Sequence, residues 1–165
     1  MSSLIWPFLL LLFLSLQTSW FLLFPGLGGA PDFLLLFLVF FAMMQGSNKG
    51  LGCGLVLGLV QDVLVLPTFG FHLLSRGLVG YLVGQTKERI SKEHVYSYVL
   101  LVVLVSIFVK LAYFVVLLVL AGGQIMQLGH FPGEFLIYVA QNAALAFPLW
   151  WLLSWLHLWV ERHNN

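Results

Sequence analysis

Three charged side chains lie inside long apolar segments, where each would be costly to bury alone. Asp62 ends the glycine-dotted run "GLGCGLVLGLVQD", Arg76 lies within "GFHLLSRGLVGYLVG", and Lys110 lies near the middle of a later apolar segment. A lone charge at the centre of a membrane helix costs about 2.5 to 3.5 kcal/mol on insertion scales. At 1.5 Å per residue the three lie at similar depths, so Arg76 and Lys110 could both reach Asp62.

Two interpretations of these charges are open. In one, Asp62 pairs with Arg76 or Lys110 as an intramembrane charge clamp that fixes how the helices pack. In the other, the charges line a proton or ion path, or a polar cavity for a substrate. We favour the clamp, because a relay needs several titratable groups in series and here one acid faces two fixed cations.

The remaining polar residues predict neither a reaction centre nor a metal site. His72, Ser75 and Arg76 share a helix face, but the sequence has no G-x-S-x-G elbow and no H-E-x-x-H motif. The other histidines are too scattered to converge on one metal. We therefore expect no enzymatic activity, no catalytic residues, no metal and no cofactor. Interhelical hydrogen bonds are the simplest role for three amide side chains, those of Gln17, Gln141 and Asn142.

The composition indicates an integral membrane protein. Of 165 residues, 61% are hydrophobic and only 8% are charged, whereas about a quarter of the residues in soluble domains are charged. The formal net charge of +1 gives no basic surface for nucleic acid. At roughly 20 apolar residues per span, the chain can hold about six spanning helices and no sizeable aqueous domain.

We predict an all-α integral membrane protein with six transmembrane helices in one polytopic domain, residues 1–165. The helices are expected at residues 4–24, 33–45, 50–66, 69–85, 95–121 and 134–160. The second reaches only about 20 Å, short for an unassisted span, so it tilts, starts earlier, or dips without crossing. Six spans with both termini in the cytoplasm satisfy the positive-inside rule, because they place these basic residues inside: Lys49, Lys87, Arg89, Lys92 and Arg162.

Glycines spaced for close helix packing mark the third and fourth helices. Gly50, Gly54 and Gly58 recur every four residues and continue to Asp62, so they form one stripe that faces protein. The next helix has its own small-residue face, formed by Gly77, Gly80 and Gly84. Small residues at these spacings let two helix backbones approach closely within a membrane.

The order of these motifs resembles the central region of the rod shape-determining protein MreD family. In that family a Pro-Asp pair opens the second helix, a glycine-spaced helix ends in Gly-Leu-x-x-Asp, a glycine turn follows, and the next helix closes in Gly-Tyr-x-x-Gly. The matching residues here are Pro31, Asp32, Gly58, Leu59, Asp62, Gly70, Gly80, Tyr81 and Gly84. This matching region, from Pro31 to Gly84, is about a third of the chain.

The resemblance implies a non-enzymatic scaffold of the cell-elongation machinery in the bacterial inner membrane. Its members bind MreC, a single-span protein, and through it the actin-like MreB, the RodA glycosyltransferase and the elongation penicillin-binding protein. Such a protein regulates cell shape and peptidoglycan synthesis by offering helix faces to its partners, and it could also form a homodimer within the complex.

The resemblance also supplies an alternative function. Members of the family look similar in arrangement to the substrate-binding S components of energy-coupling-factor vitamin transporters. An S component needs an outward pocket, for which this sequence offers Trp20, Asp32, His72, His130 and Glu134. The first helix lacks the small-residue motif through which an S component docks on its coupling partner, and we therefore favour the scaffold.

Overall fold

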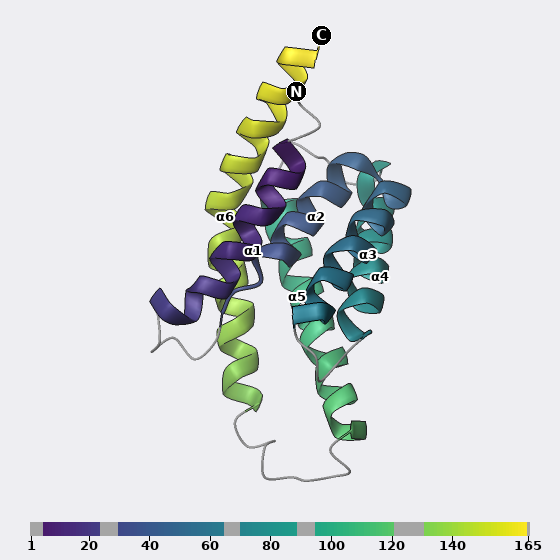
Figure 1. The fold of residues 1–165 in the computed structure, drawn as a ribbon, viewed down its shortest axis with the longest axis vertical. Coiled ribbons are helices and arrows are strands. Elements are labelled where there is room, and N and C mark those ends of the chain that lie inside the picture. Colours follow the sequence, from purple (N-terminus) through teal and green to yellow (C-terminus); the bar gives the residue numbers. More distant parts are fainter. Residues whose placement is uncertain (1–4, 24–29, 65–69, 89–94, 121–130, 165) are drawn as a thin grey trace.

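A computed structural model describes residues 5–23, 30–64, 70–88, 95–120 and 131–164 of the chain (Figure 1). Every regular element within these ranges is a helix, as expected for the all-α class. In chain order the elements are α1 (Ile5–Leu23), α2 (Phe33–Gln45), α3 (Ser47–Leu64), α4 (Phe71–Gln85), the 3₁₀ turn η3 (Thr86–Glu88), α5 (Val95–Leu120) and α6 (Phe131–Asn164).

Most helix bounds agree closely with the predicted ranges, and the differences have local causes. Helix α3 begins at Ser47 rather than at residue 50, because Gly46, with φ 92°, turns the chain directly from α2 into α3. Gly70, with φ 95°, precedes the first residue of α4. Helix α6 is longer than predicted at both ends and runs from Phe131 to Asn164. The predicted limits at residues 4, 24, 66, 69 and 121 lie outside the described residues.

Helix α2 forms the centre of the bundle although it is the shortest α-helix. Its side chains from Leu34 to Phe40 are almost completely buried, and it contacts α1, α3, α4, α5 and α6. A helix that is apolar all round is stable only when other helices cover every face. Figure 1 accordingly shows α1 and α6 on one side of α2, with α3 and α4 on the other.

Helices α5 and α6 are the long members of the bundle. Both are long and apolar enough to cross a membrane, over Val95–Val119 and Phe131–Val160. In Figure 1 they extend well below the paired helices α3 and α4. Most of their length is not covered by other helices, since about a quarter of each apolar window is buried, 22% and 28%. The six-span arrangement and the single polytopic domain stay predictions.

Candidate functional site

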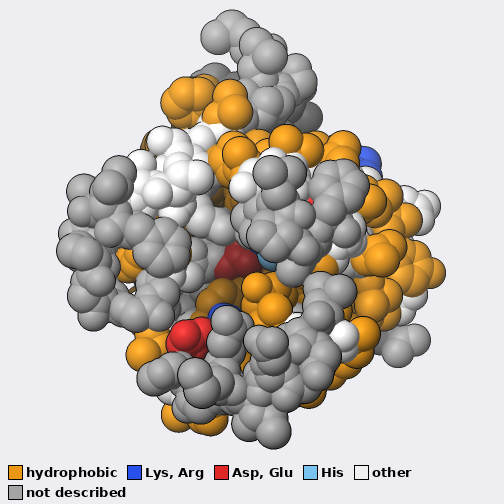
Figure 2. All heavy atoms as spheres, turned by 60° about the horizontal axis from the view of Figure 1, so that its bottom comes forward, with side chains coloured by type: hydrophobic (Ala, Val, Ile, Leu, Met, Phe, Trp, Pro, Cys, Tyr) orange, Lys and Arg blue, Asp and Glu red, His pale blue; other side chains and the backbone are white. Residues whose placement is uncertain are grey.

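The start of α2 lies beside the start of α4 and the first half of α6, at what we call the Asp32 end of the bundle. Figure 2 turns this end toward the reader and shows acidic, basic and histidine side chains inside a rim of apolar and undescribed atoms. The opposite end, where α2 passes into α3 and α4 passes into η3, is called the Lys49 end. The buried charges belong to the Asp32 end.

Asp62 caps helix α4. Its side chain is fully buried, and its two oxygens accept hydrogen bonds from the backbone N–H groups of Gly70, His72 and Leu73, at 2.9 to 3.0 Å. The first N–H groups of a helix have no partner within the helix, and the helix dipole favours a carboxylate there. Asp62 therefore ties the last turn of α3 to the first turn of α4.

Arg76 pairs with Asp32, which corrects the predicted pairing with Asp62. Its Nη2 atom donates to both carboxylate oxygens of Asp32, at 2.8 and 2.7 Å, and the two side chains are 2% and 9% exposed. Both oxygens of Asp62 already accept backbone N–H groups of α4. The charge clamp thus joins α4 to the start of α2, and within the described residues no ion pair or hydrogen bond joins the Arg76 and Asp62 side chains.

Asp32 is the centre of a hydrogen-bond network that connects four helices. Its Oδ1 atom caps α2 by accepting from Leu35 N at 2.9 Å, and its Oδ2 atom accepts from the Tyr138 hydroxyl at 3.2 Å. Its backbone N–H donates to the Asn142 amide oxygen at 2.8 Å, and the Asn142 amide nitrogen donates to Ser106 Oγ at 2.9 Å. With Arg76, these contacts link α2, α4, α5 and α6.

The Arg76 guanidinium is only partly satisfied by this network. Its Nε and Nη1 atoms are buried and have no hydrogen-bond acceptor among the described residues. Arginine carries five N–H donors, and burying a charge is strongly unfavourable unless it is paired. The fold therefore depends on Asp32 as the one carboxylate that neutralises this cation in the described part of the chain.

Lys110, the third predicted member of the clamp, lies beside the Asp32 network and not beside Asp62. Its Nζ atom is 5.0 Å from the centre of the Tyr138 ring and 5.9 Å from that of Tyr113. Its charge interacts with those of Glu134 and Asp32, but no described carboxylate lies within ion-pair distance of it. Cation–π contacts with the two tyrosines thus stabilise a half-buried ammonium group.

The predicted glycines lie at the contact between α3 and α4. A Cβ atom at Gly54 would fall within 3.0 Å of the Arg76 carbonyl oxygen, and one at Gly58 equally close to the His72 carbonyl oxygen. Comparable clashes with backbone atoms would occur at Gly50, Gly80 and Gly84, whereas Gly77 faces the side chains of Leu51 and Leu55. Only glycine allows the two backbones to approach this closely.

The residues of the predicted family motif gather mostly around the helix starts. Pro31 and Asp32 precede α2, while Asp62 and Gly70 shape the entry into α4. Tyr81 differs, since it lies on α4 with an exposed side chain. The positions other than Tyr81 therefore share one structural role, which is to begin α2 and α4 in the correct place.

The polar residues show no reactive arrangement within the described part of the chain. The Ser75 hydroxyl donates to the backbone oxygen of His72, at 3.4 Å, and not to its imidazole. The described residues contain no group of three His, Cys, Asp or Glu side chains that could hold a metal. His94 and His130 lie outside those residues. Asp62 and the Asp32 network instead join helices.

Sequence reasoning identified some of these contacts and missed others. The interhelical role expected for Gln17 and Asn142 is confirmed, because Gln17 accepts from the Leu34 N–H at 3.4 Å and Asn142 bridges α2 and α5. The contributions of Tyr138 and Ser106 were not predicted. A hydroxyl in an apolar helix carries no strong sequence signal, although the nearby Asn142 marks the same region of α6.

Comparison with protein families gives a match over most of the chain. The family model described as rod shape-determining protein MreD matches residues 1–158. Comparisons with curated proteins and with solved structures give no significant match. The matched range includes the whole Asp32 network and both glycine stripes, so these features lie within the part of the chain that resembles the family.

Proposed function

The chain belongs to the MreD family of rod shape-determining proteins, and we propose that it is a non-enzymatic scaffold of the bacterial cell-elongation machinery. The observation that carries this proposal is that the buried charged side chains hold the helices together. Asp32, Asp62 and Arg76 are all engaged in capping helices or joining them. A protein built in this way offers stable helix faces to partners instead of reactive groups to a substrate.

The scaffold is proposed to lie in the inner membrane, with six spans and both termini in the cytoplasm. The length and hydropathy of α5 and α6 support insertion into a membrane. Lys49 and Lys87 lie together at the Lys49 end, as the positive-inside rule requires of a cytoplasmic end. On this orientation the Asp32 end faces the periplasm.

We further propose that the direct partner is MreC, with MreB, RodA and the elongation penicillin-binding protein bound through it. The exposed apolar side chains along α5 and α6 support this, because a single-span partner needs an uncovered helix face. The alternative, a vitamin-binding S component, would need free polar groups in an outward pocket. The oxygens of Asp32 are already used within the protein.

The test is to purify the tagged protein from its native membrane and identify what comes with it. Mass spectrometry is expected to find MreC and RodA and no retained vitamin. An unrelated polytopic protein, tagged and expressed at the same level, controls for nonspecific capture. Recovery of two ATPases and a coupling membrane subunit, or of a bound vitamin, would overturn the scaffold and favour the transporter component.

A further inference from the structure

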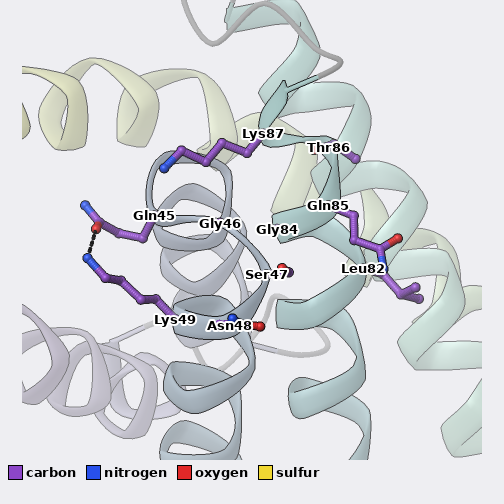
Figure 3. Close-up of a pocket in the computed structure, with 10 residues that line it drawn as sticks. All are labelled: Gln45, Gly46, Ser47, Asn48, Lys49, Leu82, Gly84, Gln85, Thr86 and Lys87. Atoms are coloured by element: carbon purple, nitrogen blue, oxygen red, sulfur yellow. Dashed lines mark hydrogen bonds between the residues drawn. The ribbon is translucent and has the colours of Figure 1, made fainter.

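A polar cavity of about 850 Å³ lies at the Lys49 end (Figure 3). It lies between the corner that joins α2 to α3 and the junction of α4 with η3. The residues that line it are Gln45, Gly46, Ser47, Asn48, Lys49, Leu82, Gly84, Gln85, Thr86 and Lys87. Its volume is within the usual range for small-ligand sites. Two lysines and several amide and hydroxyl groups line it, and none of these residues is acidic.

The two lysines bring positive charge to this cavity without a described counter-charge. Lys49 Nζ donates to the Gln45 amide oxygen at 3.0 Å, which is a neutral partner. Lys87 lies across Gly46, since a Cβ atom there would be 3.2 Å from Lys87 Cδ. In Figure 3 both ammonium groups point to the same side of the α2–α3 corner as the Gln45 side chain. Neither forms an ion pair with a carboxylate among the described side chains, which do not include that of Glu88.

An apolar helix surface continues from the cavity toward the middle of the bundle. Val56 and Val63 lie about two and four turns after Lys49 on the same face of α3, and both side chains are exposed. Leu59, which lies between them one turn from each, is also exposed and widens this surface. A cationic, donor-rich cavity above an apolar helix face is complementary to an amphiphile with an anionic head and hydrocarbon chains.

We propose that the cavity binds the headgroup of an anionic phospholipid, with its acyl chains along Val56 and Val63. The phosphate oxygens accept from Lys49 and Lys87, because basic pockets between helices recognise anionic headgroups at the membrane surface. A zwitterionic headgroup is disfavoured, since its own ammonium group would meet the two lysines. This inference goes beyond the scaffold and does not depend on MreC.

The test measures which lipid the full-length protein retains. The protein is purified in mild detergent with equimolar phosphatidylglycerol and phosphatidylcholine, and native mass spectrometry counts the bound lipids. The wild type is expected to retain phosphatidylglycerol preferentially. Lys49→Gln and Lys87→Gln are each expected to reduce that preference about fivefold, and the double variant about 25-fold, from the typical contribution of one basic residue at a membrane surface.

Arg162→Gln is the matched control, because it removes one exposed positive charge from a residue that does not line the cavity. It is expected to leave the lipid preference unchanged. An equal loss in this variant would show unspecific charge attraction and would overturn the proposal, as would a wild type with no preference. If the lysine variants lost MreC while lipid retention stayed the same, the cavity would belong to a protein segment instead.

Discussion

Helix α3 contacts α4 through backbone atoms, whereas α2 contacts α4 and α6 through polar side chains. In the first contact, Gly54 and Gly58 lie directly against carbonyl oxygens of α4. In the second, Asp32 reaches Arg76 and Tyr138 through its carboxylate. The first contact is therefore sensitive to any atom that is added, and the second to any charge that is removed.

The difference follows from what each pair of helices must accommodate. Helices α3 and α4 are neighbours in the chain, and Asp62 fixes the start of α4 against the end of α3. Close backbone packing needs only small residues at the right period. Helix α2 must instead be fixed relative to helices that are distant in sequence, and its buried charge selects one partner geometry. Three substitutions test this contrast, and all use the same measurement.

Asp32→Asn is expected to have the largest effect. It leaves the buried Arg76 guanidinium without a counter-charge, and breaking a buried ion pair in this way costs about 3 to 5 kcal/mol. Size-exclusion chromatography measures the folded fraction that remains after heating in detergent. The apparent Tm obtained in this way is expected to fall strongly. Glu134→Gln, an exposed acid at the same end, is the control and is expected to change little.

If Asp32→Asn lowered the apparent Tm no more than this control, the pair of Asp32 and Arg76 would not stabilise the fold.

Gly54→Ala is expected to have the next largest effect, because the new methyl group would overlap the Arg76 carbonyl oxygen. The two helices must separate along their length, and overpacking of this kind typically costs 1 to 3 kcal/mol. Gly52→Ala is the matched control on the same helix, since a Cβ atom there meets nothing within 4 Å.

The same change is expected to lower the stability at Gly54 and to raise it at Gly52. In an exposed helix interior, Gly→Ala is stabilising by about 1 kcal/mol, so the apparent Tm of Gly52→Ala should rise slightly. Equal behaviour of the two variants would contradict the close approach of α3 to α4.

Asp62→Asn is expected to have the smallest effect of the three. The amide retains one acceptor oxygen but loses the charge and part of the cap on α4, a loss of about 1 to 2 kcal/mol. The apparent Tm should fall clearly less than in Asp32→Asn. The reverse order would indicate that Asp62, and not Asp32, balances the buried cation.

The amino-acid sequence by itself determined which segments become helices and which helices approach closely. The limits of α2 at Phe33 and Gln45 agree with the prediction, because a polar or glycine residue bounds the apolar run on each side. The four-residue period of Gly50, Gly54 and Gly58 placed these glycines on one face, as the helical repeat of 3.6 residues requires. Both features are local, so a linear pattern is enough to read them.

Only the tertiary structure decided which charges meet. Depth along the membrane normal placed Asp62, Arg76 and Lys110 at similar levels, but it could not give the direction in which each side chain points. Asp32 and Arg76 are 44 residues apart, and they meet because α2 is buried at the centre with its first turn against α4. Asp62 instead accepts hydrogen bonds from backbone N–H groups at the start of α4, those of Gly70, His72 and Leu73. Pairing depends on helix rotation and neighbour order, and these are set by the packing of the whole bundle.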